Sequence, residues 1–404
     1  MSFPSVEKQL EVIKRGTVEI LPEEELVGKL QKSTKDGKPL RIKLGCDPTR
    51  PDLHLGHSVI LRKLRQFQDL GHHAILIIGD FTALIGDPSG QNKTRPSLSA
   101  DEIRKNANTY LEQAGKVLDL DKLEIVYNAD WLGKMSFEDV IRLSSKLTVA
   151  RMIERDDFSK RYQNNEPISL HEFLYPLAQG QDSVHLKSDV ELGGTDQKFN
   201  LLVGRHLQQL DKQPPQVCLM MPLLVGTDGT HKMSKSYDNY IGIDENPNDM
   251  YGKVLRIPDN LIYNWFELLT DVEVEKLAFY KKKAESDPRD AKHDLAFVIT
   301  EMYHGKTAAE EARNHFEQTV IKKEMPEDAL VLSFEPGTKQ RLIDIISNTG
   351  FTSSNGETKR LMKQGGVSVN DEKITDMNFE LTFTSESEFQ LKVGKRNFAI
   401  LRSE

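Results

Sequence analysis

Residues 40–90 change from a strand-like hydrophobic period to a helical period and back again. Residues 41–46 alternate charged and apolar side chains, residues 58–70 place leucine and phenylalanine at helical spacing, and residues 74–78 are continuously apolar. This order predicts a strand–helix–strand unit with a right-handed crossover. Ligands of such sheets bind at the carboxyl ends of the strands. Three polar clusters lie there, at residues 46–49, 54–57 and 86–90.

The alternation of strand and helix patterns continues to about residue 225. Residues 1–35 show a helical pattern that leads into the first strand. Such alternation predicts an open α/β domain with a parallel, Rossmann-like sheet. Further helical patterns lie at residues 101–118, 136–153, 169–181 and 198–210, and further strand patterns at residues 123–127, 189–192 and 217–224.

Strand patterns disappear after about residue 248. Residues 248–322 have helical patterns with short breaks, Pro326 and Pro336 mark residues 324–338 as a linker, and later residues mix short helices with short strands. The fold class is therefore α/β, with an all-helical domain and a small α+β domain after the parallel sheet. We predict three domains, at residues 1–228, 229–335 and 340–404.

Composition and charge narrow the class of protein. The chain has 404 residues, a net charge of −8 and 38% hydrophobic residues, which indicates a globular protein that is not basic throughout. An acidic balance still permits RNA binding through a local basic face. No apolar run reaches the roughly 18–20 residues of a membrane span. The start has no signal-peptide pattern, and the two cysteines, Cys46 and Cys218, form no zinc cluster, so we expect a reduced, cytoplasmic protein.

The cluster His54-Leu55-Gly56-His57 opens a predicted helix. Two imidazoles one turn apart at the positive end of a helix face any anion bound there. Gly56 has no side chain, so a flat ligand such as a nucleobase can approach the backbone closely. The alternative is a pair of capping or packing histidines.

A second cluster, Lys232-Met233-Ser234-Lys235-Ser236, follows the strand pattern at 217–224 and a glycine-bearing loop. Two ammonium groups three residues apart on a loop can follow charge that builds on a phosphate chain during a reaction. The alternative is a solvated basic loop. Both clusters lie in one α/β domain, in this order, and the pairing resembles the class I aminoacyl-tRNA synthetases.

Three more clusters resemble the tyrosyl-tRNA synthetase family within that class. They are Gly86-Asp87-Pro88-Ser89-Gly90, the set Tyr175, Gln179 and Asp182, and Gly193-Gly194-Thr195-Asp196-Gln197. The spacing of the second set puts its three side chains on one helix face. A carboxylate in an apolar pocket suits a phenolic hydroxyl. This family is the standard example of an enzyme that selects tyrosine over phenylalanine by binding that hydroxyl. A tryptophan-specific relative is the nearest competitor.

The resemblance implies a role for each matching residue. Tyrosine binding falls to Asp87, Tyr175, Gln179, Asp182 and Gln197. The catalytic contacts to the ATP phosphates fall to Thr49, His54, His57, Lys232 and Lys235. ATP binding further involves Asp47, Gly56, Gly194, Asp196, Met233 and Ser236 together with the two lysines. Lys93 and Arg95 are additional cations that can serve pyrophosphate or the tRNA end.

The implied reaction is the ATP-dependent ligation of L-tyrosine to tRNA(Tyr) through tyrosyl-adenylate, with release of pyrophosphate and AMP. Mg²⁺ accompanies ATP through the phosphate oxygens, and no protein metal site is expected. Residues 149–155 resemble the family's dimer-forming insertion, which we place at about residues 120–165, so a homodimer is expected. Residues 229–335 take the place of the family's anticodon-facing domain.

Residues 340–404 resemble the RNA-binding domain shared with small-subunit ribosomal protein four. Lys359, Arg360 and Lys363 lie on one predicted short helix before Gly365-Gly366, a face that can contact phosphates without reading bases. Lys392, Lys395 and Arg396 extend this basic set. The alternative is a solvated charged helix.

Lys43 departs from the family pattern. Many bacterial members carry a tyrosine four residues before the Asp-Pro pair. That side chain makes a second contact to the phenolic hydroxyl of the substrate, and here its position is occupied by Lys43. Lys43 either replaces this contact or points elsewhere. Two other classes of protein remain open: a relative that binds structured RNA without aminoacylation, and a nucleotidyltransferase that acts without tRNA.

Overall fold

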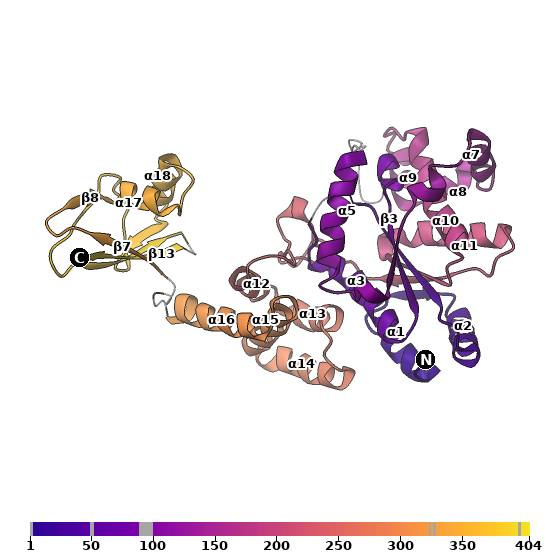
Figure 1. Ribbon diagram of the computed structural model, residues 1–404, viewed down its shortest axis with the longest axis horizontal. Coiled ribbons are helices and arrows are strands. Elements are labelled where there is room, and N and C mark those ends of the chain that lie inside the picture. Colours follow the sequence, from indigo (N-terminus) through magenta and orange to yellow (C-terminus); the bar gives the residue numbers. More distant parts are fainter. Residues whose placement is uncertain (1–2, 49–51, 89–99, 323–324, 326–328, 395–396) are drawn as a thin grey trace. The chain divides into compact units, whose positions relative to one another are not determined.

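The computed structural model describes the chain except for residues 1–2, 49–51, 89–99, 323–324, 326–328 and 395–396. The chain divides into two compact units, Met1–Ala309 and Glu310–Glu404, and each is considered by itself. Figure 1 shows their helices and strands.

The larger unit is built on a six-stranded sheet in the order β1-β6-β5-β2-β3-β4. Five strands run parallel, and β1 pairs antiparallel with β6 at one edge. The strands are β1 (Glu19–Leu21), β2 (Arg41–Cys46), β3 (His73–Ile78), β4 (Leu123–Tyr127), β5 (Val190–Gly194) and β6 (Val217–Met221). The chain order reverses between β2 and β5, which is the point where open α/β sheets bind ligands. The predicted parallel α/β fold is confirmed.

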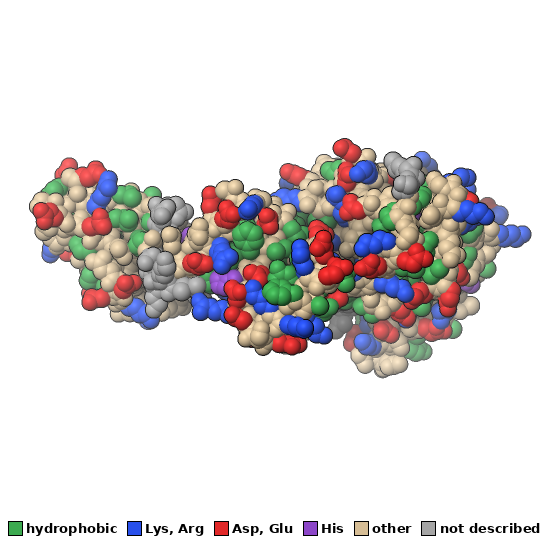
Figure 2. All heavy atoms as spheres, turned by 90° about the horizontal axis from the view of Figure 1, so that it is seen from below, with side chains coloured by type: hydrophobic (Ala, Val, Ile, Leu, Met, Phe, Trp, Pro, Cys, Tyr) green, Lys and Arg blue, Asp and Glu red, His purple; other side chains and the backbone are tan. Residues whose placement is uncertain are grey.

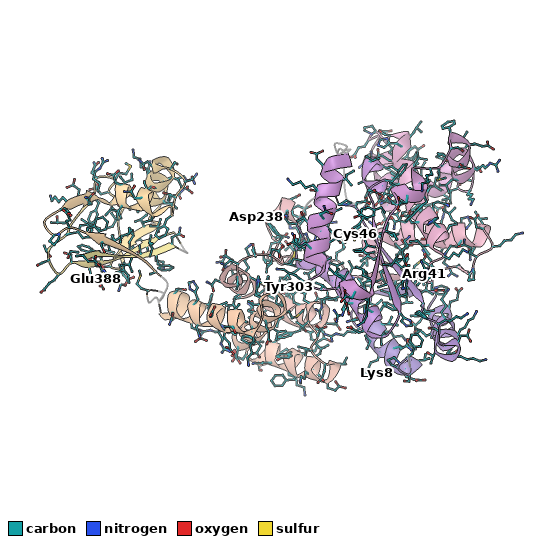
Figure 3. The ribbon with its side chains drawn as sticks, viewed as in Figure 1. Lys8, Arg41, Cys46, Asp238, Tyr303 and Glu388 are labelled. Carbon is teal, nitrogen blue, oxygen red and sulfur yellow. The ribbon has the colours of Figure 1, made fainter. Side chains whose placement is uncertain are left out.

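Helices flank this sheet. In the view of Figure 1, α3 (Leu55–Asp69) and α5 (Ala100–Ala114) lie to the left of β3, and α10 (Leu174–Leu186) and α11 (Lys198–Leu210) lie to its right. The helical spacing of Leu61, Leu64 and Phe67 predicts one apolar face, and all three side chains are fully buried. In Figure 3, Arg41 and Cys46 mark the two ends of β2, and the Cys46 end leads towards α3.

Two predictions about the larger unit were wrong in detail. Residues 19–21 form β1 and are not part of a helical lead-in; three residues at a sheet edge are too few to show a strand period. The pattern at residues 136–153 is two helices, α7 (Phe137–Ser144) and α8 (Val149–Ile153). The break occurs because Thr148 caps α8, its hydroxyl accepting the N–H of Arg151 at 3.2 Å.

The helical block after the sheet packs within the same unit. Its helices are α12 (Pro247–Val254), α13 (Ile262–Leu269), α14 (Val274–Ser286) and α15 (Pro288–His304), and α16 (Lys306–Phe316) crosses the boundary between the two units. Arg15 follows α1 (Val6–Lys14), and its guanidinium donates to the carbonyls of Glu267 at 3.1 Å and Thr270 at 2.9 Å. These bonds connect the amino-terminal helices to the end of α13. The division at residue 228 stays a prediction.

The smaller unit holds a five-stranded sheet in the order β10-β9-β12-β13-β7 and a two-stranded pair of β8 and β11. Its elements are β7 (Leu330–Phe334), β8 (Lys339–Arg341), α17 (Leu342–Thr349), α18 (Asn355–Lys363), β9 (Val367–Val369), β10 (Glu372–Lys373), β11 (Glu380–Thr382), β12 (Glu388–Val393) and β13 (Asn397–Ser403). The α+β composition is as predicted. The linker prediction for residues 324–338 was wrong, because β7 pairs in parallel with β13.

Among the described residues, no helix has both the length and the apolar content needed to cross a bilayer. The face drawn in Figure 2 carries acidic and basic side chains interspersed, as the modest net charge of −8 leads one to expect.

Candidate active site

His54 and His57 form the first turn of α3, directly after the carboxyl end of β2. The Nδ1 atom of His54 accepts the N–H of Gly56 at 3.1 Å, and the Nδ1 atom of His57 accepts the N–H of His54 at 3.2 Å. In a neutral ring the proton must then lie on Nε2. The ring centroids are 3.9 Å apart. The capping alternative is therefore correct for Nδ1, and each Nε2–H remains a donor for an anion.

Both imidazoles are held in the neutral form. Burial, the neighbouring His57 and the charge of Lys235 lower the pKa of His54 to about 2. Burial and the same lysine lower the pKa of His57 to about 4. The structure gives a second reason for glycine at position 56, which the sequence did not indicate. A Cβ at this position would lie 2.9 Å from the His54 ring.

The lysine-rich cluster lies against this helix start. The residues after it pair with the start of α3, since the N–H of Leu55 donates to the Ile241 carbonyl at 2.9 Å and His54 forms an isolated β-bridge with Gly242. Met233 is buried, and its Cβ lies 3.4 Å from the position that a Gly56 Cβ would take. Two motifs that are about 180 residues apart in the sequence are thus neighbours.

The two lysines of the cluster pair with carboxylates. Lys235 forms an ion pair with Asp52, and Lys232 lies 3.5 Å from Asp196. Burial raises the pKa of Asp196, which follows Gly194 at the end of β5, and Lys232 opposes that rise. Ser236 is exposed, with its N–H donating to Ser234 Oγ at 3.2 Å. Of these groups, Lys235 lies close enough to the two imidazoles for its charge to lower the pKa of both.

Tyr175, Gln179 and Asp182 lie on α10, as their spacing predicts. The Tyr175 hydroxyl donates to Asp47 Oδ2 at 2.9 Å, and Thr82 donates to Asp47 Oδ1 at 2.6 Å. Asp47 was assigned to ATP by resemblance, and here it connects the carboxyl end of β2 to Tyr175 of α10 and to Thr82 of α4 (Thr82–Ile85). A Cβ at Gly79 would lie 2.1 Å from Asp47 Oδ1, so glycine leaves the room that this carboxylate occupies.

Asp182 is 3% exposed and accepts two side-chain donors. Trp131 Nε1 donates to Oδ1 at 2.8 Å and Asn128 Nδ2 donates to Oδ2 at 3.3 Å. Burial raises the pKa of Asp182 to about 7, while the charge of Lys43 and these two donors act in the opposite direction. The sequence analysis missed Asn128 and Trp131. Their position directly after β4, next to β3 at the carboxyl edge of the sheet, is the signal that would have found them.

Asp87 binds two side chains that converge from different elements. Gln197 Nε2 donates to Oδ2 at 2.8 Å, and the Arg155 guanidinium donates to Oδ1 at 3.1 Å. Arg155 precedes α9 (Asp156–Gln163) and also contacts Asp157 at 2.9 Å. Sequence reasoning placed Arg155 only in the dimer-forming insertion. It is 4% exposed, and it borders a cavity of about 620 Å³ that Asp196 also lines.

Lys43 is not a surface cation. Its ammonium group is fully buried and forms an ion pair with Glu191 at 3.0 Å. Thr49, Lys93 and Arg95 lie outside the described residues. The His185 ring stacks on Trp131, with 4.4 Å between the ring centroids. The described residues contain no group of three side chains that could hold a metal ion.

Comparison with known proteins identifies the family. A family model for class I tRNA synthetases (W and Y) matches residues 34–320, and one for the C-terminal domain of tyrosine–tRNA ligases matches residues 317–401. The tyrosine–tRNA ligase of Salinibacter ruber is 54% identical over 404 residues, covering 100% of this chain and 98% of that protein. That of Chlorobium luteolum is 56% identical over 399 residues, covering 98% of each.

Solved structures share the fold at low identity. A C-terminally truncated mitochondrial tyrosyl-tRNA synthetase of Aspergillus nidulans has a TM-score of 0.65 at 22% identity, covering 78% of this chain and 94% of that one. The tyrosyl-tRNA synthetase of Archaeoglobus fulgidus, solved with L-tyrosine, has a TM-score of 0.60 at 23% identity, covering 77% and 99%. With two family models and full-length relatives in agreement, the chain belongs to the class I tRNA synthetases, in the family of the tyrosine–tRNA ligases.

Proposed function

We propose that the chain ligates L-tyrosine to tRNA(Tyr) in two steps that consume ATP. The observation that carries the specificity is Asp182, a buried carboxylate on the same face of α10 as Tyr175 and Gln179. A buried acceptor of this kind favours a ligand that brings a hydroxyl proton. Phenylalanine would leave the carboxylate without that partner, at a cost in binding free energy.

The two ends of tyrosine are assigned to different residues. Asp182 accepts a hydrogen bond from the phenolic hydroxyl. Asp87, Tyr175, Gln179 and Gln197 surround the α-ammonium group, which the negative charge of Asp87 attracts. The carboxylate of tyrosine then faces the start of α3, where His54 and His57 offer Nε2–H donors.

In the first step the tyrosine carboxylate attacks the α-phosphorus of ATP, giving tyrosyl-adenylate and pyrophosphate. Neutral imidazole donors and the positive end of α3 stabilise the charge that develops on the phosphate oxygens. Lys232 and Lys235 hold the departing pyrophosphate, and Asp196 binds the ribose hydroxyls. In the second step the terminal adenosine of the tRNA takes the tyrosyl group and AMP leaves. Positioning, not an enzyme nucleophile, accounts for the rate.

Mg²⁺ is proposed to enter with ATP. Since the described residues offer no three-ligand cluster, the phosphate oxygens are the ligands that fit this ion. When bound, Mg²⁺ neutralises part of the phosphate charge. Activity that persists in excess chelator would contradict this role.

The decisive test is exchange of labelled pyrophosphate into ATP with tyrosine, phenylalanine or tryptophan. We expect exchange with tyrosine, and exchange with phenylalanine lower by about 10⁴-fold or more in kcat/KM. If no amino acid supports exchange, the proposal is contradicted, and the alternative of an RNA-binding relative without aminoacylation is favoured. Exchange that depends on a different kind of substrate, without any need for residues 340–404, would favour a nucleotidyltransferase.

The smaller unit is proposed to bind tRNA phosphates through α18. Lys359, Arg360 and Lys363 are exposed, while Thr358 and Met362 on the same helix are buried. One face of α18 thus serves the core of the unit and the other presents cations to a partner.

Replacing Lys359, Arg360 and Lys363 together by alanine is expected to weaken tRNA binding without changing tyrosine-dependent exchange. The binding constant falls with salt, and each lost phosphate contact makes the slope of log K against log salt shallower by about 1. The triple variant should therefore have a slope smaller in magnitude by up to about 3. Lys339→Ala, an exposed lysine of β8, is the control. An unchanged slope in the triple variant would favour the solvated-helix alternative.

A homodimer is proposed from apolar side chains exposed at or near the predicted insertion. Phe137 is 80% exposed, Val149 63% and Leu170 84%. Large apolar side chains that are exposed to solvent favour a partner surface, and a symmetric second copy is the simplest partner. Light scattering should give twice the chain mass of 45.9 kDa, and a monomer at micromolar concentration would contradict the proposal. A cytoplasmic location is proposed because both cysteines are free, which cell fractionation can test.

A further inference from the structure

A buried ion pair lies between two neighbouring strands at the switch point of the sheet. Lys43 of β2 and Glu191 of β5 are direct register partners in the parallel ladder. Their side chains are 0% and 1% exposed, and Nζ lies 3.0 Å from Oε1. A charge pair buried this deeply gives little or no net stability over apolar residues of the same size, so stability does not explain it.

Every donor and acceptor of the pair is used. The Lys43 ammonium donates to Ser183 Oγ at 2.6 Å and to the backbone carbonyl of Gln179 at 3.1 Å, besides its bond to Glu191. Glu191 Oε2 accepts Ser183 Oγ at 3.0 Å and also accepts Gln216 Nε2. Glu191 Oε1 accepts Nε2 of Gln179 at 3.1 Å. The last bond leads out of the core towards the tyrosine residues.

Glu191 decides which way round the Gln179 side chain stands. A carboxylate only accepts hydrogen bonds, so it can bind the NH₂ end of an amide and not the carbonyl end. The side-chain oxygen of Gln179, Oε1, therefore faces away from Glu191 and accepts Asn200 Nδ2 at 3.0 Å. A neutral partner in place of Glu191 would remove this discrimination.

The same orientation passes along the next amides. Asn200 Nδ2 donates a second bond to Gln197 Oε1 at 2.9 Å, which leaves Gln197 Nε2 to donate to Asp87 at 2.8 Å. The Oδ1 atom of Asn200 is buried and has no hydrogen-bond partner among the described residues. The chain of bonds thus starts at an acceptor-only group, ends at Asp87, and carries an unused carbonyl oxygen beside it.

We propose that the Lys43–Glu191 pair fixes the orientation of the amides of Gln179, Asn200 and Gln197, and through Gln197 the position of Asp87, so that this set is ordered to receive the α-ammonium group of the bound amino acid. The inference rests on the proposed function, because it takes tyrosine as the ligand of these residues. Glu191 orients, Lys43 neutralises Glu191 in the core, and neither touches the ligand. Lys43 is in this way a positioning residue and not a substitute for the missing phenol contact.

Glu191→Gln tests the orientation with the least change in shape. Its amide can offer NH₂ as well as a carbonyl to Gln179, so the Gln179 side chain is free to turn over. We expect tyrosine to bind about ten-fold more weakly by calorimetry, and KM for tyrosine in pyrophosphate exchange to rise similarly, with kcat and KM for ATP nearly unchanged. Binding of 3-(4-hydroxyphenyl)propionate, which lacks the ammonium group, should change less than about two-fold.

Two further variants separate positioning from stability. Glu172→Gln breaks another buried pair of this unit, with Arg161, and should leave the affinity for tyrosine unchanged. Lys43→Met combined with Glu191→Leu removes both charges, which should recover thermal stability relative to Glu191→Gln while tyrosine binding stays weak.

The outcomes distinguish the two levels of the argument. Equal tyrosine affinity in wild type and Glu191→Gln would overturn the inference alone. An equal loss for tyrosine and for the deaminated analogue would also overturn it, since the effect would then not depend on the ammonium group. A wild type that binds neither ligand would overturn the proposed function, and the inference with it.

Discussion

Asp182→Asn is expected to lower kcat/KM for tyrosine in pyrophosphate exchange by about 100-fold, or about 2.7 kcal/mol. The carboxylate already accepts Trp131 and Asn128, and its remaining acceptor capacity is what a phenol requires. Asparagine keeps the size of the side chain but loses the charge and turns one acceptor into a donor. Asp189→Asn, directly before β5 and paired with Lys29, should change kcat/KM little and is the matched control.

The pH dependence gives this prediction a second reading. Burial raises the pKa of Asp182 to about 7, so the free enzyme loses the accepting carboxylate form as the pH falls through that value. The expected profile of kcat/KM for tyrosine falls from about pH 8 to about pH 6, and the fall is absent in Asp182→Asn. A wild-type profile that is flat over this range, together with a fully active variant, would show that the phenol is bound elsewhere.

The same raised pKa has an opposite effect on stability. Between about pH 4 and about pH 7 the folded protein keeps a proton on Asp182 that the unfolded chain has lost. This group therefore favours the folded state at low pH, and that contribution is lost as the pH rises through about 7. The active site accepts this loss because the ionised form is the one that the ligand needs.

His57→Asn is expected to lower kcat of exchange by about 100-fold or more, with little change in KM for tyrosine. The Oδ1 atom of asparagine can still accept the N–H of His54, so the start of α3 keeps its cap. What the variant lacks is a donor at the position of Nε2. His57→Gln does the reverse, offering an N–H farther along the side chain without the cap, and should recover part of kcat.

Two observations check the proposed state of these rings. Because burial and Lys235 hold the pKa of His57 to about 4, kcat at saturating tyrosine should show no imidazole inflection from about pH 6 to about pH 9. An inflection near pH 6.5 that His57→Asn abolishes would contradict the neutral donor. His206→Asn, at an exposed histidine of α11, is the control for the substitution itself.

The sequence predicted those parts of the fold that repeat a hydrophobic period over many residues. The buried run of β3 and the apolar face of α3 are such cases. Residues 19–21 and 330–334 escaped prediction because each becomes a strand only through pairing with a distant partner, β6 or β13. Local sequence does not contain that partner.

The site was predictable where a motif is local and unpredictable where it depends on contacts across the sheet. The spacing of Tyr175, Gln179 and Asp182 fixes one helix face, so their shared position followed from the sequence. Trp131 on Asp182 and Arg155 on Asp87 are bonds between side chains 51 and 68 residues apart. Only the fold brings such residues together, which is also why the role of Lys43 stayed open until Glu191 was seen beside it.

The pairing of Lys43 with Glu191 also bears on how the strands find their places during folding. A slip of β2 by one residue along β5 would turn Lys43 to the opposite face of the sheet and leave Glu191 beside Leu44. An uncompensated buried carboxylate costs about 3–5 kcal/mol, which is a large part of the stability of an ordinary domain. Apolar neighbours such as Ile42 and Leu44 tolerate such slips better, because one buried aliphatic contact replaces another. The ion pair thus selects one alignment of the two central strands among several that bury similar apolar surface.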